Sequence, residues 1–140
     1  MTAATSVQRQ MVQGSILQVF GPVVDVQFPE GHMPNLYNAI SVVDAQKGID
    51  LVLEVAQQLG NSTARCVAMS STDGMSRGMA AVDTGAPISV PVGDVTRGRL
   101  FDVLGRALEV GVAHPRPGEK MPQVAAEATL PIHRAAPTFD

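Results

Sequence analysis

Residues 14–28 read GSILQVFGPVVDVQF, and this stretch carries the clearest fold signal in the chain. A short apolar run ends at Phe20, and the pair Gly21-Pro22 that follows it predicts a bend. Val24, Val26 and Phe28 then alternate with polar residues, so that one face of the next segment is apolar and the other is wet. The stretch therefore predicts two strands joined by a turn.

Further short apolar runs follow at intervals of roughly ten residues, separated by turn-forming residues. Three of them lie at residues 40–42, 51–55 and 65–69. Lys47-Gly48 marks a turn after the first of these runs, and Gly60-Asn61 interrupts the pattern again. Five strand candidates at this spacing favour an all-β barrel or sandwich.

The pattern changes after Asp83-Thr84-Gly85. Apolar residues at 88, 90 and 92 predict one more strand, which should be short or at an edge because Pro91 cannot donate to a ladder. Asp94 or Thr96 can cap a following helix, with its apolar face formed by Leu100, Val103 and Leu104 and its end at Gly105. Residues 111–140 contain five prolines and are expected to be extended and rich in loops.

The composition describes one modest soluble domain, or a small domain and part of a second. The chain has 140 residues, of which 45% are apolar and 16% are charged, and its net charge is −3. Without a basic cluster, nucleic acid is not an expected partner. No apolar run approaches the roughly 20 residues needed to span a bilayer, and residues 1–13 lack the apolar core of a secretory signal. We expect a cytoplasmic chain without direct membrane insertion.

Candidate reactive residues are few, and their surroundings favour structural roles. Cys66 is the single cysteine and lies in an apolar run, which is typical of a small buried thiol. The three histidines, His32, His114 and His133, are far apart, without the short paired spacing of zinc ligands, and each lies near a proline, so we expect them to be solvated. No elbow motif supports a nucleophilic serine. Residues 70–74 (SSTDG) are interpreted as a tight turn between strands and not as a phosphate site.

Several segments together resemble the β-subunit of F-type ATP synthases. In addition to residues 14–28, the similar stretches are LEVAQQLG at 53–60, AMSSTDGMSRG at 68–78, VDTGAPISVPVG at 82–93, TRGRLFDVLG at 96–105 and PIHRAAPTF at 131–139. They occur in the family's order and cover most of the chain. One departure is Arg-Ala-Leu-Glu at 106–109, where the family usually has Glu-Pro-Ile-Asp.

The resemblance implies a mainly β fold with three parts. Residues 1–13 would be a flexible tail, residues 14–84 a small closed six-stranded β-barrel, and residues 85–140 the truncated beginning of the nucleotide-binding α/β domain, with one short helix and an extended C-terminal tail. In the family, α- and β-subunits alternate in a three-plus-three hexamer around a central stalk. The complex is peripheral on the cytoplasmic face of the bacterial inner membrane and couples proton transport to ATP synthesis.

The residues that handle nucleotide are expected to be missing. The full-length family binds ATP or ADP with Mg, and this requires the loop Gly-x-x-x-x-Gly-Lys-Ser/Thr. The chain has only two lysines, Lys47 and Lys120, and neither follows a glycine. We therefore predict no catalytic, cofactor-binding or metal-binding residue here, and an inactive chain on its own.

The leading hypothesis is that the barrel serves assembly of the hexamer. Arg77, Arg97 and Arg99 could contact a neighbouring subunit, or they could belong to a solvated turn or a helix start. Interface involvement is favoured only for the turn from Met75 to Met79, and only weakly, because methionines adapt to apolar partners. The alternative is a stand-alone barrel that binds a ligand or an oligonucleotide. Four phenylalanines and one tyrosine, without a basic cluster, make the alternative weaker. ATP turnover by the chain alone would indicate a third class, an enzyme.

Overall fold

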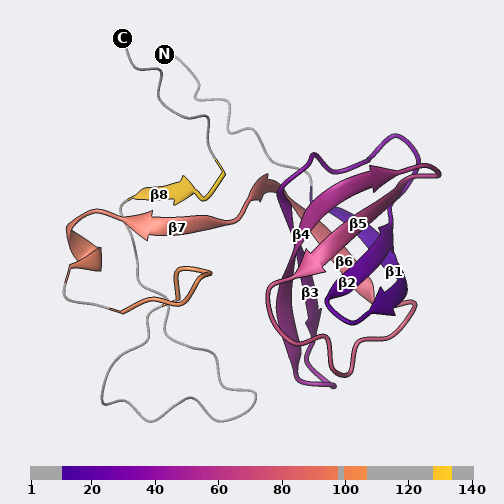
Figure 1. Ribbon diagram of the computed structural model, residues 1–140, viewed down its shortest axis with the longest axis horizontal. Helices are drawn as coiled ribbons and strands as arrows, with labels where there is room; N and C mark the ends of the chain where they lie inside the picture. The colour runs from indigo at the N-terminus through magenta and orange to yellow at the C-terminus, as the bar shows by residue number, and fades with distance from the viewer. Residues whose placement is uncertain (1–10, 98–99, 107–127, 134–140) are drawn as a thin grey trace, which may run out of the picture.

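The computed structural model describes residues 11–97, 100–106 and 128–133, and its main body is a closed antiparallel β-barrel of six strands (Figure 1). The strands are β1 (Val12–Phe20), β2 (Val23–Gln27), β3 (Asn38–Asp44), β4 (Ile49–Leu59), β5 (Thr63–Ala68) and β6 (Ala80–Pro87). Their order around the barrel is β1-β2-β5-β4-β3-β6, and β6 pairs with both β3 and β1. Each barrel strand therefore has two neighbours, which confirms the expected mainly β fold with a closed six-stranded barrel.

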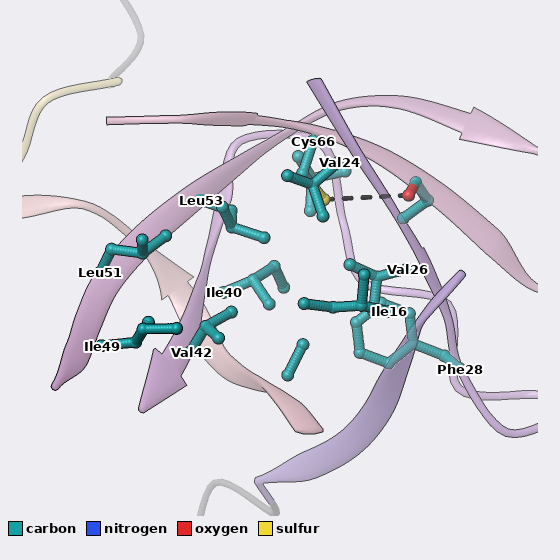
Figure 2. Packing of buried hydrophobic residues seen from close by; sticks show 13 residues of the cluster. Ile16, Val24, Val26, Phe28, Ile40, Val42, Ile49, Leu51, Leu53 and Cys66 are labelled. Atoms are coloured by element: carbon teal, nitrogen blue, oxygen red, sulfur yellow. Dashed lines mark hydrogen bonds between the residues drawn. The ribbon is translucent and has the colours of Figure 1, made fainter. Parts of the chain in front are cut away.

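The barrel closes because alternate side chains of its strands are apolar and point into one core. On β2, Val24 and Val26 are fully buried, as the alternation in the sequence predicted. Figure 2 shows their side chains together with Ile16, Ile40 and Leu53, which come from three other strands. The five strands predicted from apolar runs in residues 14–69 are all present, and their bounds extend the predicted runs by a few residues.

Gly14 allows β1 to approach its neighbour closely. A Cβ atom at this position would lie 2.6 Å from the backbone oxygen of Gln27 and 2.9 Å from the ring of Phe28. The ring of Phe28, which is itself buried, thus occupies the space that a side chain at position 14 would need. This glycine is required by packing and not by a turn.

The sixth strand, β6, was not recognised as a strand from its own residues. It consists mostly of small and polar residues, including Asp83 and Gly85, which are depleted in strands. Asp83 is nevertheless buried, since its Oδ1 atom accepts hydrogen bonds from Asn38 Nδ2 at 3.1 Å and from the Gly85 backbone N–H at 2.9 Å. β6 is therefore a strand because it pairs with β1 and β3 and because Asp83 is hydrogen-bonded, although its sequence shows little apolar alternation.

After the barrel, β7 (Ser89–Val92) pairs in antiparallel fashion with β8 (Ala128–Pro131), and the short 3₁₀ turn η1 (Asp94–Thr96) follows β7. The predicted short strand around Pro91 is thus present, and among the described residues β7 has no second partner. Figure 1 places this two-stranded sheet beside the barrel. Residues 107–127 and 134–140, which include most of the predicted extended tail, lie outside the described residues.

The predicted helix after β7 was wrong for residues 100–106. Asp102 Oδ1 accepts hydrogen bonds from the backbone N–H groups of Leu104 and Arg106, and the chain turns there instead of continuing helically. An aspartate that bonds nearby backbone amides in this way competes with helix formation. Leu100 and Val103 are exposed, so the proposed apolar helix face also has nothing to pack against. Where Asp94 or Thr96 was predicted to cap an α-helix, the structure has only the three-residue 3₁₀ turn η1.

Candidate interaction surface

A partly buried ion pair, with a buried aspartate and an arginine that is 40% exposed, lies on the outward side of the barrel, on the face of β2 opposite to its core residues. Asp25 is only 2% exposed, and its carboxylate accepts hydrogen bonds from Arg65 Nε and Nη2 at 2.9 and 3.0 Å and from Gln18 Nε2 at 2.7 Å. The register of the sheet places Gln18, Asp25 and Arg65 side by side on β1, β2 and β5. The paired guanidinium therefore lowers the pKa of the Asp25 carboxyl below its usual value.

One step further along the same strands, the outward side chains are apolar. Phe20 pairs in register with Val23, and Val23 pairs with Val67. We call these three residues the apolar row. Phe20 is 54% exposed and Val67 is 36% exposed, so that the row is open to solvent directly beside the Asp25–Arg65 pair. An open apolar strip next to a fixed polar pair is a surface suited to a protein partner.

The next strand, β4, presents acidic side chains on its outward side, and these contact the segment after the barrel. Glu54 Oε2 lies 3.0 Å from His133 Nε2, and Asp50 Oδ1 lies 4.0 Å from Arg106 Nη2. The ring of His133 also stacks on Tyr37, with centroids 4.1 Å apart and planes inclined by 22°. In contrast to the apolar row, the outward acidic side chains of β4 are in contact with other residues of the same chain.

Cys66 has the buried position that its sequence neighbours predicted. It lies within the core shown in Figure 2, and its Sγ atom is 3.9 Å from the backbone oxygen of Ala64. Burial, assisted by the negative charges of Asp25 and Asp83, raises the pKa of the thiol to about 12. A thiol with so little thiolate is a packing residue and not a nucleophile.

The histidines do not come together. His32 is exposed in the loop between β2 and β3, in agreement with the expected solvated histidine, whereas His133 is engaged by Glu54 and Tyr37. His133 is exposed, as expected, but it also contacts Glu54, a residue 79 positions away in sequence that becomes its neighbour only in the fold. His114 lies outside the described residues.

The loop between β5 and β6 closes one part of the barrel. Met75 and Met79 are partly buried and pack against the core, so the apolar contacts that made them interface candidates are made internally. Arg77 between them is exposed. Residues 70–74 form the expected turn, with Thr72 Oγ1 donating to the Gly21 backbone oxygen at 2.7 Å and the Met75 N–H donating to the Thr72 oxygen at 3.0 Å.

The remaining charged candidates have local partners or lie outside the described residues. Lys47 Nζ donates to Ser76 Oγ at 3.1 Å, and Arg97 pairs with Asp94 at 3.2 Å on an exposed surface. Arg99 and Lys120 lie outside the described part of the chain. Within the described ranges, no three potential metal ligands gather, and no helix has the length and apolarity required to cross a bilayer.

A comparison with family models adds the decisive observation. The model of the "ATP synthase alpha/beta family, beta-barrel domain" matches residues 16–85, which is half of the 140-residue chain. The chain belongs to this family. The match begins within β1 and ends within β6, so the ATP synthase alpha/beta barrel corresponds to the closed barrel described above.

Among the described residues, no glycine-rich loop of the kind that holds nucleotide phosphates is present. The printed sequence has no Gly-x-x-x-x-Gly-Lys-Ser/Thr loop, and Lys47 is committed to Ser76 on the loop between β5 and β6. No step of nucleotide chemistry can be derived from the described residues.

The apolar row was the feature missed from the sequence. Phe20, Val23 and Val67 belong to runs that also supply core residues, and only the strand register shows that these three point outward together. Val23 and Val67 each lie one position from a core residue of their own strand, Val24 and Cys66, and strand alternation could have placed them outward. Phe20 lies four positions from the core residue Ile16, and it points outward only because a β-bulge between Ile16 and Gln18 shifts the alternation.

Proposed function

We propose that this chain is the N-terminal portion of the catalytic β-subunit of a proton-translocating F-type ATP synthase, and that its barrel serves assembly of the α/β hexamer. The family itself implies assembly into α/β hexamers. The choice of the F-type β-subunit is supported by the stretches at residues 68–78 and 82–93, which resemble that subunit. In this proposal the complex lies on the cytoplasmic face of the inner membrane, and ATP, ADP and Mg bind to parts of the full-length subunit that are not represented here.

The observation that carries the assembly role is the open apolar row beside a fixed ion pair. Phe20 and Val67 are exposed although they belong to strands whose other face fills the core. A barrel of this size buries a limited core, so contacts with neighbouring subunits should add to its stability. The partner proposed for this surface is the barrel of an α-subunit.

The test is association of the full 140-residue chain with purified α-subunit, measured by native mass spectrometry and by the melting temperature of the mixture. We expect a complex, and a higher melting temperature for the barrel in the mixture than alone. F20D and V67D should each weaken association at least about tenfold, because a charge is placed in the apolar contact. V43D is the matched control, since Val43 is also an exposed valine but lies on β3.

Two results would contradict the proposal. One is a barrel that neither binds α-subunit nor gains stability from it. The other is equal loss of binding in V43D and in the apolar-row variants, which would place the contact elsewhere or make it nonspecific. Binding to β-subunit in preference to α-subunit would instead identify the chain as α-like within the same family.

No observation favours the oligonucleotide-binding alternative. Base stacking on a barrel uses several exposed aromatic rings next to free basic groups. Here Arg65 is held by Asp25, and Tyr37 is stacked on His133. We expect a titration with single-stranded oligonucleotide at low salt to show no binding.

A further inference from the structure

We propose that Glu54 on β4 is a latch site at which the barrel holds His133, just after β8, with the help of Tyr37, and thereby fixes the two-stranded β7–β8 sheet relative to the barrel. This role is distinct from subunit assembly, because it joins two parts of one chain. The three residues come from the loop before β3, from the middle of β4 and from the position two residues after β8. We call them the latch.

The contacts of the latch are specific in both chemistry and geometry. An ionised carboxylate can only accept, so His133 donates its Nε2–H to Glu54 Oε2 across 3.0 Å. The other side of the imidazole is covered by the Tyr37 ring at 4.1 Å. The Glu54 side chain is 18% exposed and the His133 side chain is 40% exposed, so the hydrogen bond lies at the surface with its acceptor partly covered.

Tyr37 is held in place by contacts within the barrel that do not involve His133. Its backbone has a φ of 69°, a left-handed conformation that is uncommon for a tyrosine, and its N–H donates to the Val55 oxygen at 2.8 Å. Val55 is the neighbour of Glu54 on β4. The two barrel residues of the latch are therefore positioned by the same stretch of strand.

The β7–β8 sheet is expected to need a stabilising contact with the barrel, because a two-stranded sheet with four residues in each strand has little stability of its own. The Ile132 N–H extends the ladder by donating to the Ile88 oxygen at 2.8 Å, and His133 is the next residue. The latch thus acts one residue from the end of the ladder. A second contact, Arg106 with Asp50 at 4.0 Å, joins the same face of β4 to residues 100–106.

The test is amide hydrogen exchange of the full chain, followed residue by residue by NMR in E54A, H133A and the double variant. We expect each single change to speed exchange of the Ile132 amide by about two- to fivefold, which corresponds to the loss of one partly exposed hydrogen bond. The Leu53 amide, within the barrel, should keep its exchange rate. Because the two residues act on each other, the double variant should exchange no faster than the single variants.

Matched controls are E30A and H32A, which change an exposed glutamate and an exposed histidine in the loop between β2 and β3. They should leave the Ile132 amide unchanged. E54Q, which retains the shape and one acceptor oxygen, should fall between the natural chain and E54A. If E54A loosens the barrel as a whole, H133A and E54Q still report on the latch alone.

The proposal would be overturned if H133A exchanged at Ile132 like H32A, or if the effects of E54A and H133A were simply additive. A uniform rise at Leu53 and Ile132 in H133A would also count against it, since that result describes loss of barrel stability. None of these readouts depends on association with another subunit, so they can fail while the assembly proposal stands.

Discussion

In the barrel, alternate side chains of six strands meet in one core, whereas in the described segment after β6 several large apolar side chains are exposed. The core cluster includes Ile40, Leu53 and Val55, which are fully buried. Downstream, Ile88 is buried, but Leu100, Val103, Leu130 and Ile132 are exposed. The difference shows that the apolar side chains of this chain are buried together where each strand has two neighbours. It also places most of the folding free energy in the barrel.

The largest effect should come from a cavity in the core. We expect L53A to lower the free energy of unfolding by about 2–5 kcal/mol, because Leu53 is 0% exposed and its neighbours cannot fill the space. The downstream counterpart is V103A, at a residue that is 75% exposed, and it should change stability by less than about 0.5 kcal/mol. Urea denaturation followed by circular dichroism gives both values, and similar losses in the two variants would break the comparison.

The next effect tests the close approach of β1 to β2. G14A should destabilise the barrel by about 1–3 kcal/mol, because the added Cβ would meet the backbone oxygen of Gln27, which cannot turn away as a side chain can. Gly60 is the matched control, since nothing lies within 4 Å of a Cβ built there. If G60A cost as much as G14A, backbone conformation would be the cause instead of packing. Thermal unfolding of the two variants distinguishes these outcomes.

A smaller effect, with a defined pH dependence, is expected at the partly buried ion pair of Asp25 and Arg65. D25N should cost about 1–2 kcal/mol at pH 7, through loss of the charged hydrogen bonds from Arg65. Because the folded-state pKa of Asp25 is lowered, its stabilising contribution is present above the unfolded value of about 3.9 and is lost as pH falls through the folded value. Denaturation between pH 7 and pH 2.5 should show the two proteins converging in acid. A gap that persists at the lowest pH would mean that shape, and not charge, is the cause.

The smallest effect should be at the downstream ion pair. Asp94 and Arg97 are paired at 3.2 Å, but both side chains are more than 80% exposed. D94A should therefore alter the free energy of unfolding by no more than about 0.5 kcal/mol, and added salt should remove even this difference. A cost as large as that of D25N would show that η1 contributes to the stability of the whole chain. Urea denaturation at low and high salt provides the measurement.

The sequence predicted the barrel where alternation was strong and failed where side-chain chemistry acts locally. Val24, Val26 and Phe28 alternate clearly enough to fix a strand and its inward face. β6 gave no such signal because its burial depends on Asp83 and the hydrogen bonds that Asp83 accepts. The helix predicted through Leu104 was wrong because Asp102 binds the backbone amides of a turn.

The surfaces were harder to predict than the core. A core residue is marked by its own apolarity, but the apolar row exists only because the register aligns Phe20, Val23 and Val67 on three strands. The contact between Glu54 and His133 joins residues that are 79 positions apart. Neither arrangement follows from local pattern, since both depend on how the strands are ordered around the barrel.

The buried thiol of Cys66 can serve as a natural probe of barrel opening. As the single cysteine, with a pKa raised to about 12, it should react with a thiol-modifying reagent only when the barrel transiently opens. The rate of modification would then measure how often the barrel opens, without an added label. Slower modification in the presence of a partner subunit would measure, at one sulfur atom, how much docking restrains that motion.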